Sequence, residues 1–422
     1  MRISSQQAFN LGVSGIQKNY SEMIRTQQQI STGNRILTPA DDPVASVRLM
    51  QLEQQQNMLT QYKDNLVAAE NSLVQEESTL DAVNTIMQRI RVLAEEAGNG
   101  ALSKADRQSI AAELREREDE LLGLMNTKNA RGEYLFAGFQ GKTQPFVRQA
   151  EGTFQYMGDE GQRKLQIASS MDVAISDNGK SIFQNITNAS RLNGSFAAPP
   201  GAGSTLSFSA PLIQDEVAFA GVPGYPNSEF SITFAAAPNQ KNYTVTEVGS
   251  GTVLQTGSLD DDDRLHDSLV FGGVIVHIDG VPEGGEEIRI GQPGTVGAGP
   301  SREKQGVLDT VYQLRKALED NEDTPEGMRA TRDAVASAIT NIDHAMVSID
   351  STRGNIGARR NVIETTLTDN ENVTLVNQEV QAELREVDYP EALSKLAFQS
   401  IILEAAQQSY VKTSQLSLFN RM

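Results

Sequence analysis

Apolar residues recur every seven positions along a stretch near the start of the chain. The stripe consists of Leu52, Leu59, Leu66, Leu73, Leu80 and Met87. A second stripe, three residues further on, is less regular because Gln55 and Glu76 interrupt it. Six heptads predict one coiled-coil-like helix over residues 44–97, with Pro43 at its start and glycines at its end. The stripe is therefore the predicted core of a helical rod.

The last third of the chain shows helical faces of the same kind. They comprise Val307, Val311, Leu314 and Leu318, then Val335, Ile339, Ile342, Met346 and Ile349. Between the two runs, Thr324-Pro325 has the composition of a helix start. We expect residues 307–349 to pack against residues 44–97, with Ile339, Ile342 and Met346 completing the rod core.

The two chain ends carry narrower apolar stripes among glutamine, serine, threonine and asparagine. The stripes contain Phe9, Val13, Ile16, Tyr20, Met23 and Ile30 near the start, and Ala392, Leu396, Leu403, Ala406 and Tyr410 near the end. Isolated helices of this kind are only marginally stable. We therefore expect residues 1–32 and 390–422 to be disordered in the monomer, and these eleven residues to form an assembly interface.

The middle of the chain has a different composition. Residues 141–300 contain 22 of the 34 glycines and 10 of the 14 prolines. Residues 230–234, 243–246 and 274–280 alternate as strands do. The expected fold is mainly α with a β insertion (α+β), in which long helices from both chain ends pair into a coiled-coil-like rod.

This pattern predicts three domains. Residues 1–40 with 375–422 form a terminal coiled-coil domain, and residues 41–140 with 301–374 form a helical rod domain. Residues 141–300 form a β-rich outer domain inserted between the two halves of the rod.

Charge and composition exclude several classes of function. Lysine and arginine total 36 against 55 aspartates and glutamates, a net charge of −19. That balance argues against binding nucleic acid or an anionic membrane surface. The chain has no cysteine, so disulfides and thiolate chemistry are ruled out. No apolar run is long enough for a transmembrane helix, and the N-terminus lacks the features of a cleavable signal peptide.

Residues suited to catalysis or metal binding are few. The histidines His266, His277 and His344 lie in different kinds of segment, and each is interpreted as structural. The acidic run at 260–263 lacks the spaced ligands of a calcium loop and is interpreted as a solvated turn. No catalytic, cofactor-binding or metal site is predicted, so the chain is not expected to be an enzyme.

Three segments resemble the flagellar hook-associated protein 3 family, within the bacterial flagellin superfamily. They are ISTGNRILTPADDPVA at 30–45, NARGEYLFAGF at 129–139 and YVKTSQLSLFNRM at 410–422. The resemblance covers both flanks, roughly residues 1–140 and 301–422. The PADDP and RGEYLFAGF forms are similar to this family rather than to flagellin itself.

The resemblance implies a structural axial protein of the flagellum, located outside the cell. It would join the hook, through hook-associated protein 1, to the flagellin filament, and would contact further copies of itself in a helical array. It would be exported by the flagellar type III apparatus without a cleaved signal, with an export chaperone bound within residues 380–422. Two alternatives remain open: a flagellin-type filament subunit, and a surface adhesin that acts through the β insertion.

Overall fold

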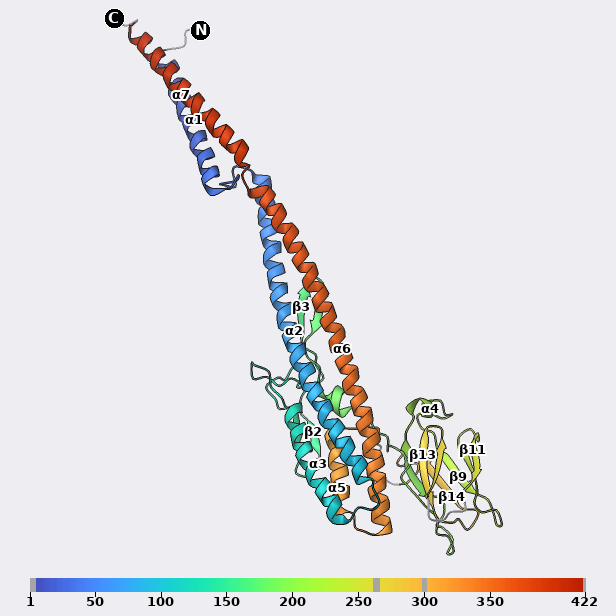
Figure 1. Cartoon of the computed structure of the whole chain (residues 1–422). Helices are drawn as coiled ribbons and strands as arrows, with labels where there is room; N and C mark the ends of the chain where they lie inside the picture. Colours follow the sequence, from blue (N-terminus) through green and yellow to red (C-terminus); the bar gives the residue numbers. More distant parts are fainter. Residues whose placement is uncertain (1–4, 261–265, 298–301, 420–422) are drawn as a thin grey trace. The chain divides into compact units, whose positions relative to one another are not determined.

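In chain order, long helices come before and after a strand-rich middle (Figure 1). The computed structural model describes residues 5–260, 266–297 and 302–419. The helices are α1 (Ser5–Thr32), α2 (Pro43–Ala97), α3 (Lys104–Met125), α4 (Glu216–Ala220), α5 (Val307–Asp320), α6 (Pro325–Arg385) and α7 (Tyr389–Phe419). The predicted fold class, mainly α with a β insertion, is confirmed. No helix in the described part of the chain has both the length and the apolar character that crossing a membrane requires.

The chain divides into two compact units, and the division falls within α2 and α6. One unit contains Ile167–Ser170 together with the described residues up to Leu66 and from Glu364 onward. The other unit contains Val67–Gln166 and the described residues of Met171–Ile363.

The heptad stripe of α2 is its buried side. Leu66, Leu73, Leu80 and Met87 are fully buried, Leu52 is almost so, and Leu59 is half-buried. The predicted rod-core residues on α6 are less uniform: Ile342 is buried, whereas Ile339 and Met346 are half-buried. Helix α2 ends at Ala97, where Gly98 and Gly100 follow, as the sequence predicts. Next, Ser103 and Asp106 form a reciprocal capping box that starts α3.

Ion pairs link α2 to α6 within the second unit. Asp343 accepts from Arg91 at 2.7 Å, and Arg353 lies 3.0 Å from Asp81. Two turns further on, Arg360 reaches Glu70 at 2.8 Å and also pairs with Glu77. The contact between the two helices therefore continues beyond the predicted 307–349 segment.

Helix α6 is continuous for 61 residues, much longer than its apolar pattern indicates. Its buried positions include Ile349, Ile356 and Ile363, which are seven residues apart. The same register then places Asn377 at a buried position, with 7% of its surface exposed. Asparagine at such a position sets the register of paired helices at a cost in stability. The heptad spacing of α6 therefore continues past Ile363, with a polar residue at the buried position.

The strands of the inserted region are short and antiparallel. They are β1 (Phe146–Arg148), β2 (Phe154–Tyr156), β3 (Lys164–Ala168), β4 (Met171–Ala174), β5 (Ile186–Thr187), β6 (Asn193–Phe196), β7 (Ser207–Phe208), β8 (Leu212–Ile213), β9 (Phe230–Phe234), β10 (Asn242–Glu247), β11 (Val253–Ser258), β12 (Asp267–Phe271), β13 (Val274–Asp279), β14 (Glu287–Gly291) and β15 (Lys304–Gln305). The three strands predicted from alternation correspond to β9, β10 and β13.

Two sheets form the core of this region. Five strands pair in the order β11-β10-β9-β14-β6, and β12-β13-β7 form the second sheet, with β8 also paired to β13. Alternate residues of β13, namely Val274, Val276 and Ile278, are buried. The Phe230 ring on β9 meets the Phe271 ring on β12 at 5.3 Å between centroids, so the two sheets share one core.

Candidate functional site

Helices α1 and α7 lie side by side in the first unit, so the two ends of the chain form one helical pair (Figure 1). The rings of Phe9 and Tyr410 are 5.3 Å apart. A Cβ atom at Gly12 would lie 3.1 Å from the Tyr410 ring, so the glycine allows the helices to approach closely. Ala392 and Leu403 are buried in this pair, with 6% and 8% of their surfaces exposed.

The predicted assembly residues differ in exposure. Phe9 and Tyr20 are about half exposed, at 51% and 53%. The half-buried members are Val13, Ile16, Met23, Ile30, Leu396, Ala406 and Tyr410. The predicted assembly residues therefore lie largely on the side where α1 and α7 face each other.

A second apolar stripe on α7, absent from the predicted interface, is exposed. Leu393, Phe398 and Ile401 expose 53%, 66% and 63% of their surfaces, and Leu11 on α1 exposes 67%. Ile401 and Ile402 follow Phe398 by three and four residues, so this stripe is also present in the sequence. An exposed apolar strip on a paired helix is typical of a surface that meets another protein.

The first signature segment, at 30–45, contains the linker between α1 and α2. After α1, Gly33 adopts a left-handed φ of +71° and its carbonyl accepts from the Val387 N–H at 2.9 Å. Two residues later, the Arg35 N–H donates to the Arg385 carbonyl at 2.8 Å. The linker between α1 and α2 is thus hydrogen-bonded to the linker between α6 and α7.

Both aspartates of this signature accept hydrogen bonds from the backbone. Asp41 accepts from the N–H groups of Leu37 and Thr38, each at 3.0 Å, and pairs with Arg25 at 2.6 Å. The Thr38 N–H is the main cause of a pKa for Asp41 below its usual value. Asp42 accepts from the Ala45 N–H at 3.0 Å, and so caps the start of α2. The two aspartates therefore stabilise the linker between α1 and α2 and the start of α2.

The second signature, at 129–139, folds as a loop anchored by its own side chains. Asn129 accepts from the N–H of Arg131 at 2.9 Å and of Glu133 at 3.0 Å. Phe136 is fully buried, with its ring 5.2 Å from that of Phe183. The third signature, at 410–422, belongs to α7 as far as Phe419, and its last three residues lie outside the described part.

Glu76, which interrupted the second stripe of the sequence, is buried at the centre of a polar network. Its Oε1 accepts from the Asp177 N–H at 3.0 Å. Asp177 in turn pairs with Arg359 of α6. Burial first, and then the negative charge of Asp177, raise the pKa of Glu76 to about 8. The carboxyl group is therefore neutral at pH 7, although it lies in a heptad helix.

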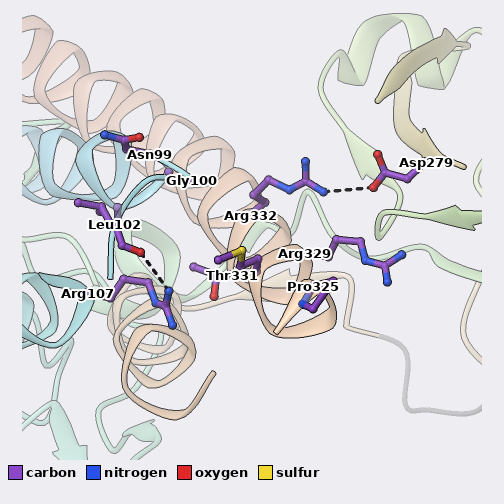
Figure 2. A pocket seen from close by; sticks show the side chains of 12 residues that line it. Asn99, Gly100, Leu102, Arg107, Asp279, Pro325, Arg329, Thr331 and Arg332 are labelled. Carbon is purple, nitrogen blue, oxygen red and sulfur yellow. Dashed lines mark hydrogen bonds and ion pairs between the residues drawn. The ribbon is translucent and has the colours of Figure 1, made fainter. Parts of the chain in front are cut away.

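A cavity of about 410 Å³ lies between the end of α2 and the start of α6 (Figure 2). Each of the three arginines that line it is paired with a carboxylate. Arg332 lies 3.3 Å from Asp279, as Figure 2 shows. Arg107 pairs with Asp323 at 2.8 Å, and Arg329 lies 3.7 Å from Glu326. The carboxylate that lines the cavity is Asp279, and its partner Arg332 occupies it, so the charged groups here pair with one another.

Two of the three histidines meet, contrary to their separation in the sequence. The His266 and His277 rings are 4.7 Å apart because the β12–β13 hairpin pairs Ser268 with His277. The Ser268 hydroxyl lies 2.8 Å from Nδ1 of His277. Burial, followed by His266 and Arg332, lowers the pKa of His277. This is a cross-strand hydrogen bond, and no group of three or more metal-ligating side chains is found among the described residues.

The remaining predictions of chemistry concern His344 and the acidic run. His344 on α6 places Nδ1 2.9 Å from the Thr187 carbonyl. Of the acidic run at 260–263, only Asp260 belongs to the described residues.

Comparison with known proteins relates these helices to the flagellum. The family model for the bacterial flagellin N-terminal helical region matches residues 3–141. Flagellar hook-associated protein 3 of Escherichia coli K12 is 32% identical over 242 residues, which cover 57% of this chain and 74% of that protein. The chain belongs to the flagellar hook-associated protein 3 family.

Other members of the family agree. Flagellar hook-associated protein 3 of Salmonella typhimurium LT2 is 35% identical over 188 residues, covering 44% of this chain and 58% of that protein. The crystal structure of the flagellar junction protein FlgL from Legionella pneumophila is similar with a TM-score of 0.60 at 25% identity. That match covers 80% of this chain and all of the Legionella chain. The chain is thus a structural protein of the bacterial flagellum.

Proposed function

We propose that this chain is the adapter between the flagellar hook and the filament. It would bind hook-associated protein 1 on one side and the first flagellin subunits on the other, with copies of itself beside it. The observation that carries this proposal is the exposed apolar stripe on α7, at Leu393, Phe398 and Ile401, in a chain of the hook-associated protein 3 family. A helical array would cover such a stripe in every subunit.

The proposed mechanism is assembly through contacts between protein surfaces, with no chemical reaction. In the assembled subunit, Ala392 and Leu403 would be buried where α7 packs against α1, and the outer stripe would be left for neighbouring molecules. Apolar burial of about 25 cal/mol per Å² would favour each new contact. We propose that the chain needs no cofactor, since its role is to present two different end contacts.

Export is the second part of the proposal. The subunit would leave the cell unfolded through the flagellar type III apparatus, without a cleaved signal, and would act outside the cell. Residues 1–32 and 390–422 would be disordered before assembly and would form the α1–α7 pair in the array. An export chaperone would cover the apolar residues within 380–422 until secretion.

Genetic complementation tests this function. A strain that lacks its own hook-associated protein 3 is given this chain, and we expect filaments on the hooks and restored swimming. The matched variants are Phe398→Glu, on the exposed stripe, and Met171→Glu, at an exposed position in the inserted region. The first should abolish filament attachment, and the second should not. Attachment by the Phe398 variant would contradict the proposed contact.

A flagellin-type subunit is the competing function, because the matched family model is shared with flagellins. The same strain distinguishes the two. A flagellin would build a filament only above an existing junction, so it would leave hooks bare in this strain. An adhesin acting through the inserted β strands would likewise leave the hooks bare.

A further inference from the structure

Three asparagines of the chain are followed directly by glycine: Asn99, Asn178 and Asn193. Such a pair is chemically labile, because the backbone nitrogen of the glycine can attack the side-chain amide carbon of the asparagine. Glycine permits this attack because it has no Cβ atom to block the approach or to restrict the backbone. The reactivity of each pair therefore depends on how the fold holds the two residues.

The first pair lies in the turn between α2 and α3, where both Asn99 and Gly100 are exposed. The Gly100 N–H makes no hydrogen bond in the part of the chain that the structure describes, so its nitrogen is free to react. A Cβ atom at Gly100 would meet nothing within 4 Å. The turn therefore leaves room for a ring to close between the two residues.

The Asn99 side chain is folded back over the turn. Its Oδ1 accepts from the Ala101 N–H at 3.1 Å, and its backbone carbonyl accepts from the Leu102 N–H at 3.1 Å. The first hydrogen bond closes a ring of atoms that contains the Gly100 nitrogen, and so brings the amide carbon back towards that nitrogen. A donor on Oδ1 also stabilises the negative charge that this oxygen acquires during the attack.

The second pair is held in an unreactive arrangement. Gly179 is buried, and its N–H donates to the Phe136 carbonyl at 2.9 Å. The Asn178 amide is bound at both ends, since Oδ1 accepts from the Ser181 N–H at 2.9 Å and Nδ2 donates to the Glu160 carbonyl at 3.3 Å. Attack would require the loss of these hydrogen bonds.

The third pair belongs to strand β6. Asn193 and Gly194 lie opposite Gly291 and Ile290 of β14 in the antiparallel register. A Cβ atom at Gly194 would lie 2.5 Å from the Phe208 ring, so the space beside this glycine is filled. Ring closure here would require both residues to leave the strand pairing.

We propose that Asn99 is a site of spontaneous deamidation in the folded chain. The Gly100 nitrogen bonds to Cγ of Asn99, the bond from Cγ to Nδ2 breaks, and ammonia leaves with the proton of the Gly100 N–H. Water then opens the cyclic imide at one of its two carbonyl carbons, which leaves aspartate or isoaspartate at position 99. The reaction needs only water from the solvent.

The product changes the charge of the cavity in Figure 2. Asn99 lines this cavity together with Arg107, Arg329 and Arg332. Deamidation replaces a neutral amide by a carboxylate, so it adds one negative charge beside these arginines.

The test follows the folded full-length chain over several weeks in mildly alkaline buffer. Digestion in mildly acidic buffer and mass spectrometry detect a gain of one dalton at each asparagine, and electron-transfer fragmentation identifies isoaspartate. Asn99 should react at least about tenfold faster than Asn178 and Asn193, since only those two must first lose hydrogen bonds of the fold. Equal rates at the three asparagines would overturn the proposal.

The same incubation in urea tests whether the fold sets the rates. All three asparagines precede glycine, so their rates should become similar once the chain is unfolded. If Asn178 stayed slow in urea, its hydrogen bonds would not be the cause of its protection, and the proposed explanation would be wrong.

Two glycine variants test the attacking nitrogen. Gly100→Ala places a methyl group in open space, so the fold should persist while deamidation of Asn99 slows about tenfold. Gly123→Ala is the matched control, because its Cβ atom would also meet nothing within 4 Å but it does not follow an asparagine. An unchanged rate in Gly100→Ala would overturn the assignment of the Gly100 nitrogen.

Discussion

Glutamine in place of Glu76 tests whether a neutral carboxyl group is part of the folded rod. Glutamine keeps the shape of the side chain and the acceptor for the Asp177 N–H, but it does not titrate. The largest cause of the raised pKa is burial, and the neighbouring charge of Asp177 acts in the same direction. Removing the titrating group should therefore remove a pH dependence from the stability.

The magnitude follows from the shift from the usual value of 4.5 to about 8. The folded chain holds a proton that the unfolded chain releases, so this contribution to stability is complete below pH 4.5. It is lost as pH rises towards 8, by about 1.4 kcal/mol per pH unit and about 5 kcal/mol in total. Between pH 4.5 and 7, the variant should gain about 3 kcal/mol relative to wild type.

Urea denaturation followed by far-UV circular dichroism measures this difference at pH 4, 5.5, 7 and 8.5. The measurement at pH 4 is the internal control, because both side chains are then neutral in both states. The difference in free energy of unfolding should widen up to about pH 8 and then remain constant. Parallel curves for the two proteins across this range would refute the assignment of a buried neutral carboxyl group.

Three further predictions concern the helices. Glu118 is fully buried between two arginines, so Glu118→Leu should lower the free energy of unfolding in urea by about 3 kcal/mol. The exposed-pair control Glu120→Gln should change it by less than about 1 kcal/mol, and equal effects would contradict this account. Ile401→Lys should block assembly in electron micrographs while leaving the circular dichroism unchanged. Trypsin should digest residues 1–32 and 390–422 of the soluble subunit first; protected ends would contradict a disordered monomer.

Helices with regular apolar spacing could be predicted from the sequence alone. The leucines from Leu52 to Leu80 predict α2 because side chains seven apart share one face, and the observed helix starts at the predicted Pro43. Helix α6 was only partly predictable, because Asn377 occupies a heptad position normally filled by an apolar residue. A polar residue at such a position carries no hydropathy signal.

The candidate site was harder to predict, because a periodic pattern does not say which partner covers a face. Leu403 and Ile401 both belong to apolar stripes of α7, yet Leu403 is buried in the α1–α7 pair and Ile401 is exposed. Glu76 stood out in the sequence as a misfit, but its role depends on Asp177, which is 101 residues away. His266 and His277 come together only through the register of one hairpin. These relations are tertiary and leave no local signal.

Electron microscopy of isolated hooks capped with hook-associated protein 1 tests the central claim most directly. The purified chain is added first, and flagellin is added afterwards. The adapter account predicts a short terminal zone of this protein, followed by filament growth only where that zone is present. A long filament built from this chain alone, or filament growth that does not need it, would contradict the account.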